Sequence, residues 1–196
     1  MSRPPQTNLL AHGLRVGLGM VLFAAALWII QVVNAATGDA FVPYGIVPRS
    51  VSGLEGVVFA PFIHGSFEHI AANTLPLLIL GFLAAVRGTG RFLGASAIII
   101  AVSGIGVWLT AASGSVTVGA SGLILGYFGY LLARGVFDHA VADIVIAVVV
   151  AVFYGTLIFA VLPSQAGVSW QAHLFGLIGG VLAAWMQRRP RRLSRA

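Results

Sequence analysis

A small hydroxyl nucleophile beside glycines is the first feature of this sequence that could do chemistry. Ser121 stands in Gly119-Ala120-Ser121-Gly122, at the head of the apolar run Leu123–Ala133. A helix that begins at this glycine-containing turn would favour developing negative charge through its dipole. Because the chain has 25 glycines, the pattern alone also fits a small-residue packing surface. Leu123 excludes the Gly-x-Ser-x-Gly elbow of α/β-hydrolases.

His173 is the residue that could activate this serine, because an imidazole next to a hydroxyl can take its proton. Gly176 and Gly180 lie three and seven residues further on, so they share a helix face with the histidine. Gly122 and Gly126 give the run after the serine a matching face without side chains. We expect the two faces to pack together and to bring the serine and the histidine to one membrane depth, near the outer ends of their helices. The alternative for a membrane histidine is an interhelical hydrogen bond.

Two polar residues four positions apart, His69 and Asn73, share one helix face in the apolar run Pro61–Val86. Polar side chains at membrane depth should face the bundle interior or a wet cavity, and both side chains can donate hydrogen bonds to an oxyanion. The alternative is a metal site on His64 and His69, but their separation suits one helix face poorly, and Glu68 is the only carboxylate close by. We therefore expect no metal, an oxyanion role for His69 and Asn73, and a supporting role for His64.

The composition indicates a membrane protein. Hydrophobic residues make up 59% of the 196 residues and charged residues 8%, whereas about a quarter of a soluble domain is charged. The net charge of +6 comes from arginines in short loops and tails, with no lysine, so it does not indicate nucleic-acid binding. The absence of cysteine excludes a disulfide, a thiolate zinc site and a cysteine nucleophile.

Six apolar runs can each form a membrane-spanning helix. They are Gly17–Ala36, Pro61–Val86, Phe92–Ala112, Ala120–Ala133, Ile144–Leu162 and Trp170–Met186. We expect a cytoplasmic N-terminal tail at 1–14, a six-helix domain at 15–187 and a basic cytoplasmic tail at 188–196, with a charged turn at Arg134–Asp143. In this arrangement Arg49 alone lies outside, so the positive-inside rule places both termini in the cytoplasm.

The first apolar run has an alternative interpretation as a signal peptide, because Val33-Asn34-Ala35 resembles a small-residue cleavage site. The run has about 20 apolar residues, whereas the apolar region of a signal has roughly 7–15, so we expect a retained span. Arginine without lysine, together with much Ala, Val and Gly, is typical of GC-rich bacteria. We therefore expect a multi-pass protein of the bacterial inner membrane.

Three motifs taken together resemble the rhomboid intramembrane serine proteases. They are His-x4-His-x3-Asn at His64–Asn73, Gly-x-Ser-Gly at Gly119–Gly122 and Ala-His-x2-Gly-x3-Gly at Ala172–Gly180, on the second, fourth and sixth apolar runs. The resemblance covers the chain from about Val47 to Met186. It implies an all-α membrane fold with the six-helix rhomboid core.

The resemblance also implies roles for individual residues. Ser121 would be the nucleophile and His173 the general base of a dyad. His69, Asn73 and the main chain of the turn at Gly119 and Ser121 would bind the oxyanion or the substrate.

The sequence departs from the family pattern at two places. Leu125 stands where many members carry an aromatic residue beneath the catalytic histidine, and Tyr127 falls on another face. The first outer loop has Arg49 but lacks the family's Trp-Arg pair. These departures concern the support of His173 and the anchoring of the loop, and neither removes a catalytic group.

We therefore expect an intramembrane serine endopeptidase that cleaves transmembrane segments of membrane-protein substrates near the outer face, in the lipid bilayer and without a cofactor. The sequence does not indicate an oligomeric state. The second hypothesis is a catalytically silent rhomboid-like protein that binds membrane helices, although such relatives typically lack the serine or the histidine, and both are present. The third is a small transporter, against which the lack of internal repeats and of acidic residues in mid-span counts.

Overall fold

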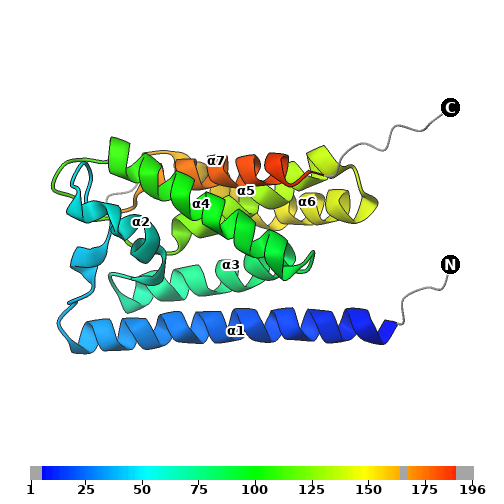
Figure 1. Cartoon of the computed structure of the whole chain (residues 1–196), viewed down its shortest axis with the longest axis horizontal. Coiled ribbons are helices and arrows are strands. Elements are labelled where there is room, and N and C mark those ends of the chain that lie inside the picture. Colours follow the sequence, from blue (N-terminus) through cyan, green and yellow to red (C-terminus); the bar gives the residue numbers. More distant parts are fainter. Residues whose placement is uncertain (1–5, 164–166, 189–196) are drawn as a thin grey trace.

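The computed structural model describes residues 6–163 and 167–188, and these form a bundle of helices (Figure 1). The α-helices are α1 (Gln6–Ala36), α2 (Gly56–Phe59), α3 (Phe67–Ala85), α4 (Thr89–Thr110), α5 (Ser121–Asp138), α6 (Val141–Tyr154) and α7 (Trp170–Met186). Short 3-10 helices lie between them: η1 (Val42–Tyr44), η2 (Ser52–Leu54), η3 (Ala60–Phe62) and η4 (Gly155–Val161). Within the described residues there is no β-strand, and one isolated bridge pairs Ile46 with Thr117. The predicted all-helical architecture is confirmed.

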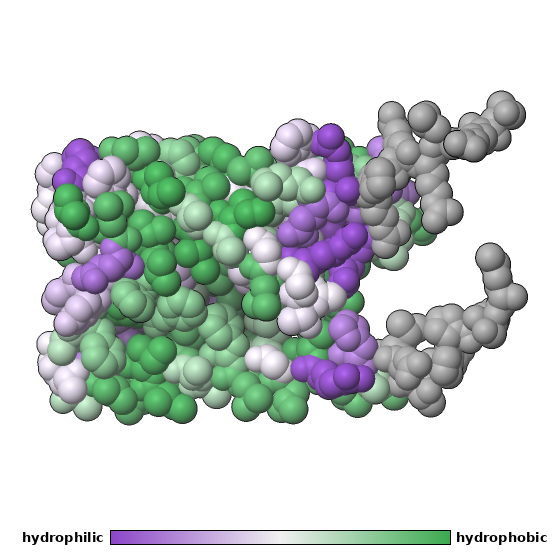
Figure 2. Space-filling model, in the orientation of Figure 1, coloured by the Kyte–Doolittle hydropathy of each residue, from purple (hydrophilic) through white to green (hydrophobic). Residues whose placement is uncertain are grey.

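Four segments are long and apolar enough to cross a membrane, judged by length and composition. They are Leu10–Ala36, Phe67–Ala85, Thr89–Thr110 and Val141–Val161. α7 is apolar but has 17 residues, and α5 falls outside the set because Arg134, Asp138 and its glycines lower its hydropathy. Apolar residues form a broad band across the molecule between two more polar ends (Figure 2). α1 begins and α7 ends at the same end of the bundle (Figure 1).

α5 is the central helix, and it packs against α3, α4, α6 and α7. Its residues from Gly122 to Gly135, except Leu132, are buried. Its contact with α7 is made by main chain. A Cβ on Gly176 would lie 2.1 Å from the carbonyl oxygen of Gly122, and a Cβ on Gly180 would lie 1.9 Å from that of Gly126. Because no side chain fits in either place, the two backbones lie directly against each other.

The prediction of a helix from Pro61 is wrong. Pro61 lies in η3, a short loop follows, and α3 begins at Phe67. Ser66 caps α3, because its Oγ accepts the N–H of His69 at 3.1 Å. Such a cap satisfies a helical N–H that has no partner within the helix. His64 therefore lies in the loop ahead of α3 and not in a helix.

The prediction of a charged turn at Arg134–Asp143 is also wrong. α5 continues through Arg134 to Asp138 and α6 begins at Val141, so only two residues connect the helices. His139 ends α5 in the left-handed conformation, with φ 51°. Arg134 and Asp143 are both buried, and Nη2 of the arginine lies 2.7 Å from Oδ1 of the aspartate. The ion pair removes the cost of burying either charge alone, which is why charged residues can lie inside helices here.

Of the remaining helix bounds, those of α7 agree with the prediction and the start of α1 does not. α7 spans Trp170–Met186 as predicted. α1 begins at Gln6, eleven residues before the predicted Gly17, and residues 6–16 contain no proline that would end a helix. The expected tail at 1–14 is therefore helical from Gln6 onward, and residues 189–196 of the expected basic tail lie outside the described residues.

Candidate active site

Ser121 is the first residue of α5, and the turn before it requires a glycine. Gly119 has φ +117°, a conformation that residues with a side chain rarely adopt. A Cβ on Gly119 would also lie 2.5 Å from Cε1 and 2.6 Å from Nε2 of His69. The first N–H groups of a helix have no partner within it, and the helix dipole is positive there. The start of α5 can therefore stabilise negative charge beside the Ser121 hydroxyl.

His173 lies in the first turn of α7 and is buried. Ser169 caps this helix, because its Oγ accepts the N–H of Ala172 at 3.3 Å. Nδ1 of His173 lies 2.8 Å from the carbonyl oxygen of Ala160 in η4. Since a carbonyl can only accept, Nδ1 of the neutral ring carries the proton in this bond, and Nε2 keeps a lone pair. The ring is thus oriented and able to take a proton at Nε2.

The first turns of α5 and α7 meet next to Ser121 and His173. A Cβ on Gly122 would lie 3.1 Å from the carbonyl oxygen of Ala172. Ser103 of α4 donates its hydroxyl to the same oxygen at 2.9 Å, so three helices meet at this point. Gly122 and Ala172, which make this contact, are the chain neighbours of Ser121 and His173. The Cα atoms of the serine and the histidine therefore lie at a similar height along the bundle.

His69 and Asn73 lie one turn apart on α3, and their surroundings differ. The imidazole of His69 lies against Gly119, in the turn before Ser121, and within electrostatic range of His173. Asn73 is buried, and its Nδ2 donates to the carbonyl oxygen of His69 at 2.9 Å. The structure thus brings His69 to the Ser121 turn, while one amide hydrogen of Asn73 is held by its own helix.

His64 is fully buried in the loop between η3 and α3. Its Nε2 lies 3.5 Å from the main-chain N of Ala120, and its ring meets the ring of His69 edge-on, with 5.1 Å between centroids. Burial lowers the pKa of His64 to about 4, with a smaller effect from the nearby charge of His69. The imidazole is therefore neutral at pH 7 and can accept the Ala120 N–H. His64 contacts both the Ser121 turn and a predicted oxyanion residue.

Three contributors to the site were not predicted from the sequence: the carbonyl of Ala160, the hydroxyl of Ser103 and the amide of Asn34. A main-chain carbonyl has no signature in the sequence. Ser103 and Asn34 lie in apolar runs, where a single polar residue gives no sign of its partner. The start of α3 could have been predicted from the sequence, because Ser66 stands three residues before His69, the spacing of a serine that caps a helix.

The two departures from the family pattern have structural counterparts. Leu125 is buried, and the orientation of His173 is provided by the Ala160 carbonyl. In the loop after α1, Arg49 donates to the carbonyl of Leu109 at 3.1 Å and to the hydroxyl of Ser113 at 2.6 Å. The indole of Trp108 donates to the carbonyl of Ser50 at 2.8 Å. A tryptophan and an arginine thus anchor this loop from different segments, with the tryptophan supplied by α4.

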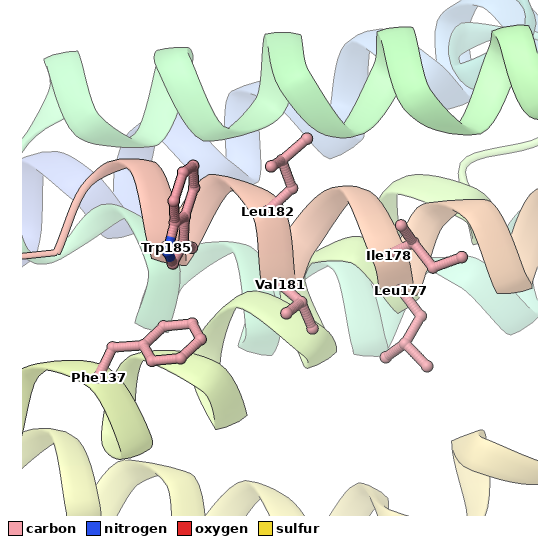
Figure 3. Close-up of a pocket in the computed structure, with 6 residues that line it drawn as sticks. All are labelled: Phe137, Leu177, Ile178, Val181, Leu182 and Trp185. Atoms are coloured by element: carbon pink, nitrogen blue, oxygen red, sulfur yellow. The ribbon is translucent and has the colours of Figure 1, made fainter.

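An apolar groove lies between α5 and α7 (Figure 3). It is lined by Phe137 of α5 and by Leu177, Ile178, Val181, Leu182 and Trp185 of α7. Phe137 is 16 residues after Ser121 on the same helix, which is roughly 24 Å along its axis. None of the lining side chains can act as an acid, a base or a nucleophile, so the groove is not the candidate active site. Its surface suits contact with lipid chains.

Known proteins resemble this chain over most of its length. A family model described as Rhomboid domain matches residues 52–190. An uncharacterized protein of Mycobacterium tuberculosis strain H37Rv is 40% identical over 188 residues, which cover 92% of this chain and 78% of that protein. An uncharacterized protein of Mycobacterium leprae is 35% identical over 198 residues, covering 97% and 79%. A Bacillus subtilis protein named "Putative rhomboid protease YdcA" is 32% identical over 135 residues, covering 66% of each.

Proposed function

Because the chain belongs to the rhomboid family, we propose that it is an intramembrane serine protease that acts through a dyad of Ser121 and His173. One observation carries the proposal: the N-terminal ends of α5 and α7 meet through Gly122, Ala172 and Gly176, beside these two residues. The bond from His173 Nδ1 to the Ala160 carbonyl adds to it, because it leaves Nε2 as the basic nitrogen.

The proposed reaction has two halves. The hydroxyl oxygen of Ser121 attacks the carbonyl carbon of the scissile peptide bond while its proton passes to Nε2 of His173. The oxyanion that forms would be held by His69 and Asn73 and by the N–H of Ser121. The C–N bond then breaks as His173 gives its proton to the leaving nitrogen. In the second half, water gives a proton to His173 and attacks the acyl group, and the ester bond to Ser121 breaks as the hydroxyl regains its proton.

The carbonyl of Ala160 takes the position that a carboxylate has in a catalytic triad. Like that carboxylate, it fixes the tautomer and the orientation of the imidazole. A carbonyl carries only a partial negative charge, so it stabilises the imidazolium less than a carboxylate would. In the proposed reaction, catalysis would therefore depend on the orientation of the His173 ring and on the helix start at Ser121 more than on a buried negative charge.

The proposal includes six spans, with α5 and α7 added to the four longer segments, and both termini in the cytoplasm of a bacterium. α1 begins and α7 ends at one end of the bundle, and the connection from α3 to α4 lies at the same end (Figure 1). Arg87 of this connection and Arg134 of α5 both pair with Asp143 near the start of α6. Ser121 would then lie toward the outer face, where it meets transmembrane segments of substrates. A reporter enzyme that is active only outside the inner membrane should work when fused in the loop 113–118 and fail when fused at the C-terminus.

A fluorophosphonate serine probe tests the dyad without a known substrate. Purified wild type in detergent should be labelled covalently, and Ser121→Ala and His173→Ala should each abolish labelling. Ser96→Ala is a matched control, because it removes a part-buried hydroxyl of α4 whose partners, Phe92 and Tyr127, do not belong to the candidate active site. If folded wild type is not labelled, or if Ser121→Ala is labelled equally, the proposal is wrong, and the helix-binding hypothesis gains support.

A further inference from the structure

Asn34 lies near the end of α1 and is fully buried. Its Nδ2 donates to Oδ1 of Asp39 and to the carbonyl oxygen of His64, each at 3.2 Å, and its Oδ1 accepts the N–H of Phe41 at 2.8 Å. A buried amide is costly unless it is hydrogen-bonded, and here both hydrogens and the oxygen have partners. The side chain therefore joins the turn after α1 to a residue 30 positions further along the chain.

The segment that Asn34 holds also holds the turn in front of Ser121. The carbonyl of Ala60 accepts the N–H of Gly119 at 2.9 Å, and the imidazole of His64 faces the N–H of Ala120 at 3.5 Å. Both amides that precede the serine are thus held by residues 60–64, one through main chain and one through a side chain. The contact at 3.5 Å is at the long end for a hydrogen bond, so a small displacement of His64 is enough to lose it.

His64 reaches the site by a second contact. Its ring lies edge-on to His69, whose own ring lies against Gly119. A displaced His64 would therefore disturb both the main chain before Ser121 and the imidazole beside it. The side chain of Asn34 bonds to Asp39, Phe41 and the main chain of His64, and the ring of His64 contacts Ala120 and His69. Their effect on Ser121 therefore passes through these groups.

We propose that Asn34 and His64 are positioning residues for the reaction of Ser121, with Asn34 fixing the main chain of His64 and His64 fixing the Ser121 turn and the ring of His69. The inference rests on the proposed function. It makes α1, which precedes the matched residues 52–190, a contributor to the active site.

The first experiment measures how fast Ser121 reacts. The variants are Asn34→Ala, His64→Leu and His64→Gln. Thr37→Val is the control, since within the described part of the chain the Thr37 hydroxyl bonds to two main-chain carbonyls at the end of α1. A displacement of the order of 1 Å at a reacting group can slow a reaction about 100-fold, so we expect Asn34→Ala and His64→Leu to be labelled at least about tenfold more slowly. His64→Gln keeps an acceptor near the Ala120 N–H and should stay within about threefold of wild type.

With a cleavable transmembrane substrate, the loss should fall on kcat, with KM changed less than about threefold, because substrate contacts remain. If His64→Gln reacts as slowly as His64→Leu, the hydrogen-bond role of the imidazole is wrong. If Asn34→Ala does not fold, Asn34→Ser, which leaves a small polar group in place, decides the same question.

The second experiment does not depend on activity. Hydrogen–deuterium exchange of peptides that cover residues 117–123 should be faster in Asn34→Ala and His64→Leu than in wild type and Thr37→Val. Folded variants with wild-type exchange and wild-type labelling would overturn the inference and leave the proposed function intact. If wild type is not labelled at all, the proposed function fails, and unchanged exchange at this turn would then overturn the positioning role separately.

Discussion

α5 has buried polar groups at both ends, and the two ends differ in charge. At the Ser121 end the partners are imidazoles, a serine hydroxyl, and main-chain amides and carbonyls. At the Arg134 end, Arg134 and Arg87 make ion pairs with Asp143 and Asp138. Two Nη2–carboxylate distances there are 2.7 Å for Arg134–Asp143 and 3.0 Å for Arg87–Asp143. The four charges sum to zero.

The difference shows how one helix can have a charged end suited to stabilising the bundle and a neutral end suited to the proposed chemistry. Buried charges are tolerated when each has a partner, and removing one partner leaves the other exposed to a low dielectric. The Arg134 network therefore suits an anchor that joins the start of α6 and the α3–α4 connection to α5. At the Ser121 end the buried partners are neutral groups, so under the proposed function the imidazole of His173 can take up and release a proton there.

We expect the largest effect on the labelling of Ser121 from Gly176→Ala, which disrupts the packing of α7 against the Ser121 end of α5. The added Cβ would lie 2.1 Å from the carbonyl oxygen of Gly122, so α7 must move away from α5 and carry His173 with it. We expect labelling of Ser121 to fall at least about 100-fold and stability to fall by about 1–3 kcal/mol. Gly19→Ala is the control, because nothing lies within 4 Å of that position, and it should change neither value. Wild-type labelling of Gly176→Ala would contradict the backbone contact between the helices.

At the Arg134 end, Asp143→Asn should lower the stability of the protein without changing the reactivity of Ser121. Arg134 would keep its buried charge without this partner, which typically costs about 3–5 kcal/mol. Thermal unfolding in detergent should show the loss, while the labelling rate per folded molecule stays within about threefold of wild type. Glu55→Gln removes a carboxylate charge at an exposed position and should change stability by less than about 0.5 kcal/mol. A tenfold slower reaction with unchanged unfolding would mean that the two ends are not independent.

The sequence predicted the Ser121 end better than the Arg134 end, for a physical reason. Ser121, His173 and the glycines between the helices stand at helix periodicity in apolar runs, and the structure brings their main chains together. At the other end, charged residues close to a turn predict solvent exposure, and nothing in one sequence shows that two of them pair. The ion pair of Arg134 with Asp143 is a tertiary contact, and only the fold could reveal it.

The partners of the catalytic candidates were harder to predict than the candidates themselves. The carbonyl of Ala160 orients His173, and any residue could supply a carbonyl there. Asn34 has the surroundings of a signal-peptide cleavage site in the sequence, yet it is buried and bonded to the loop that carries His64. Residue types identify reactive groups, whereas the groups that hold them in place depend on contacts between distant segments.

The smallest effect concerns the titration of His64, which is expected to make the Ser121 end sensitive to acid. Its pKa is about 4 in the folded protein, against an ordinary value of 6.5. Between these values the unfolded chain binds more protons than the folded one, so stability is full above about pH 6.5 and falls as the pH is lowered. At pH 5.5 the loss from this one group should be about 1 kcal/mol.

The unfolding midpoint in detergent should therefore drop more for wild type than for His64→Gln when the pH is lowered from 7.5 to 5.5. His69 and the other titratable groups are common to both proteins, so the difference between the two slopes reports His64. Equal slopes would mean that the His64 imidazole is solvated or paired when protonated, and the Ser121 end would then not depend on a neutral ring at this position. A steeper wild-type slope would mean that acid destabilises the Ser121 end of α5. Among the described residues, Arg134 at the other end has the carboxylate of Asp143 as a partner, whereas the buried imidazole of His64 pairs with main chain and with the ring of His69.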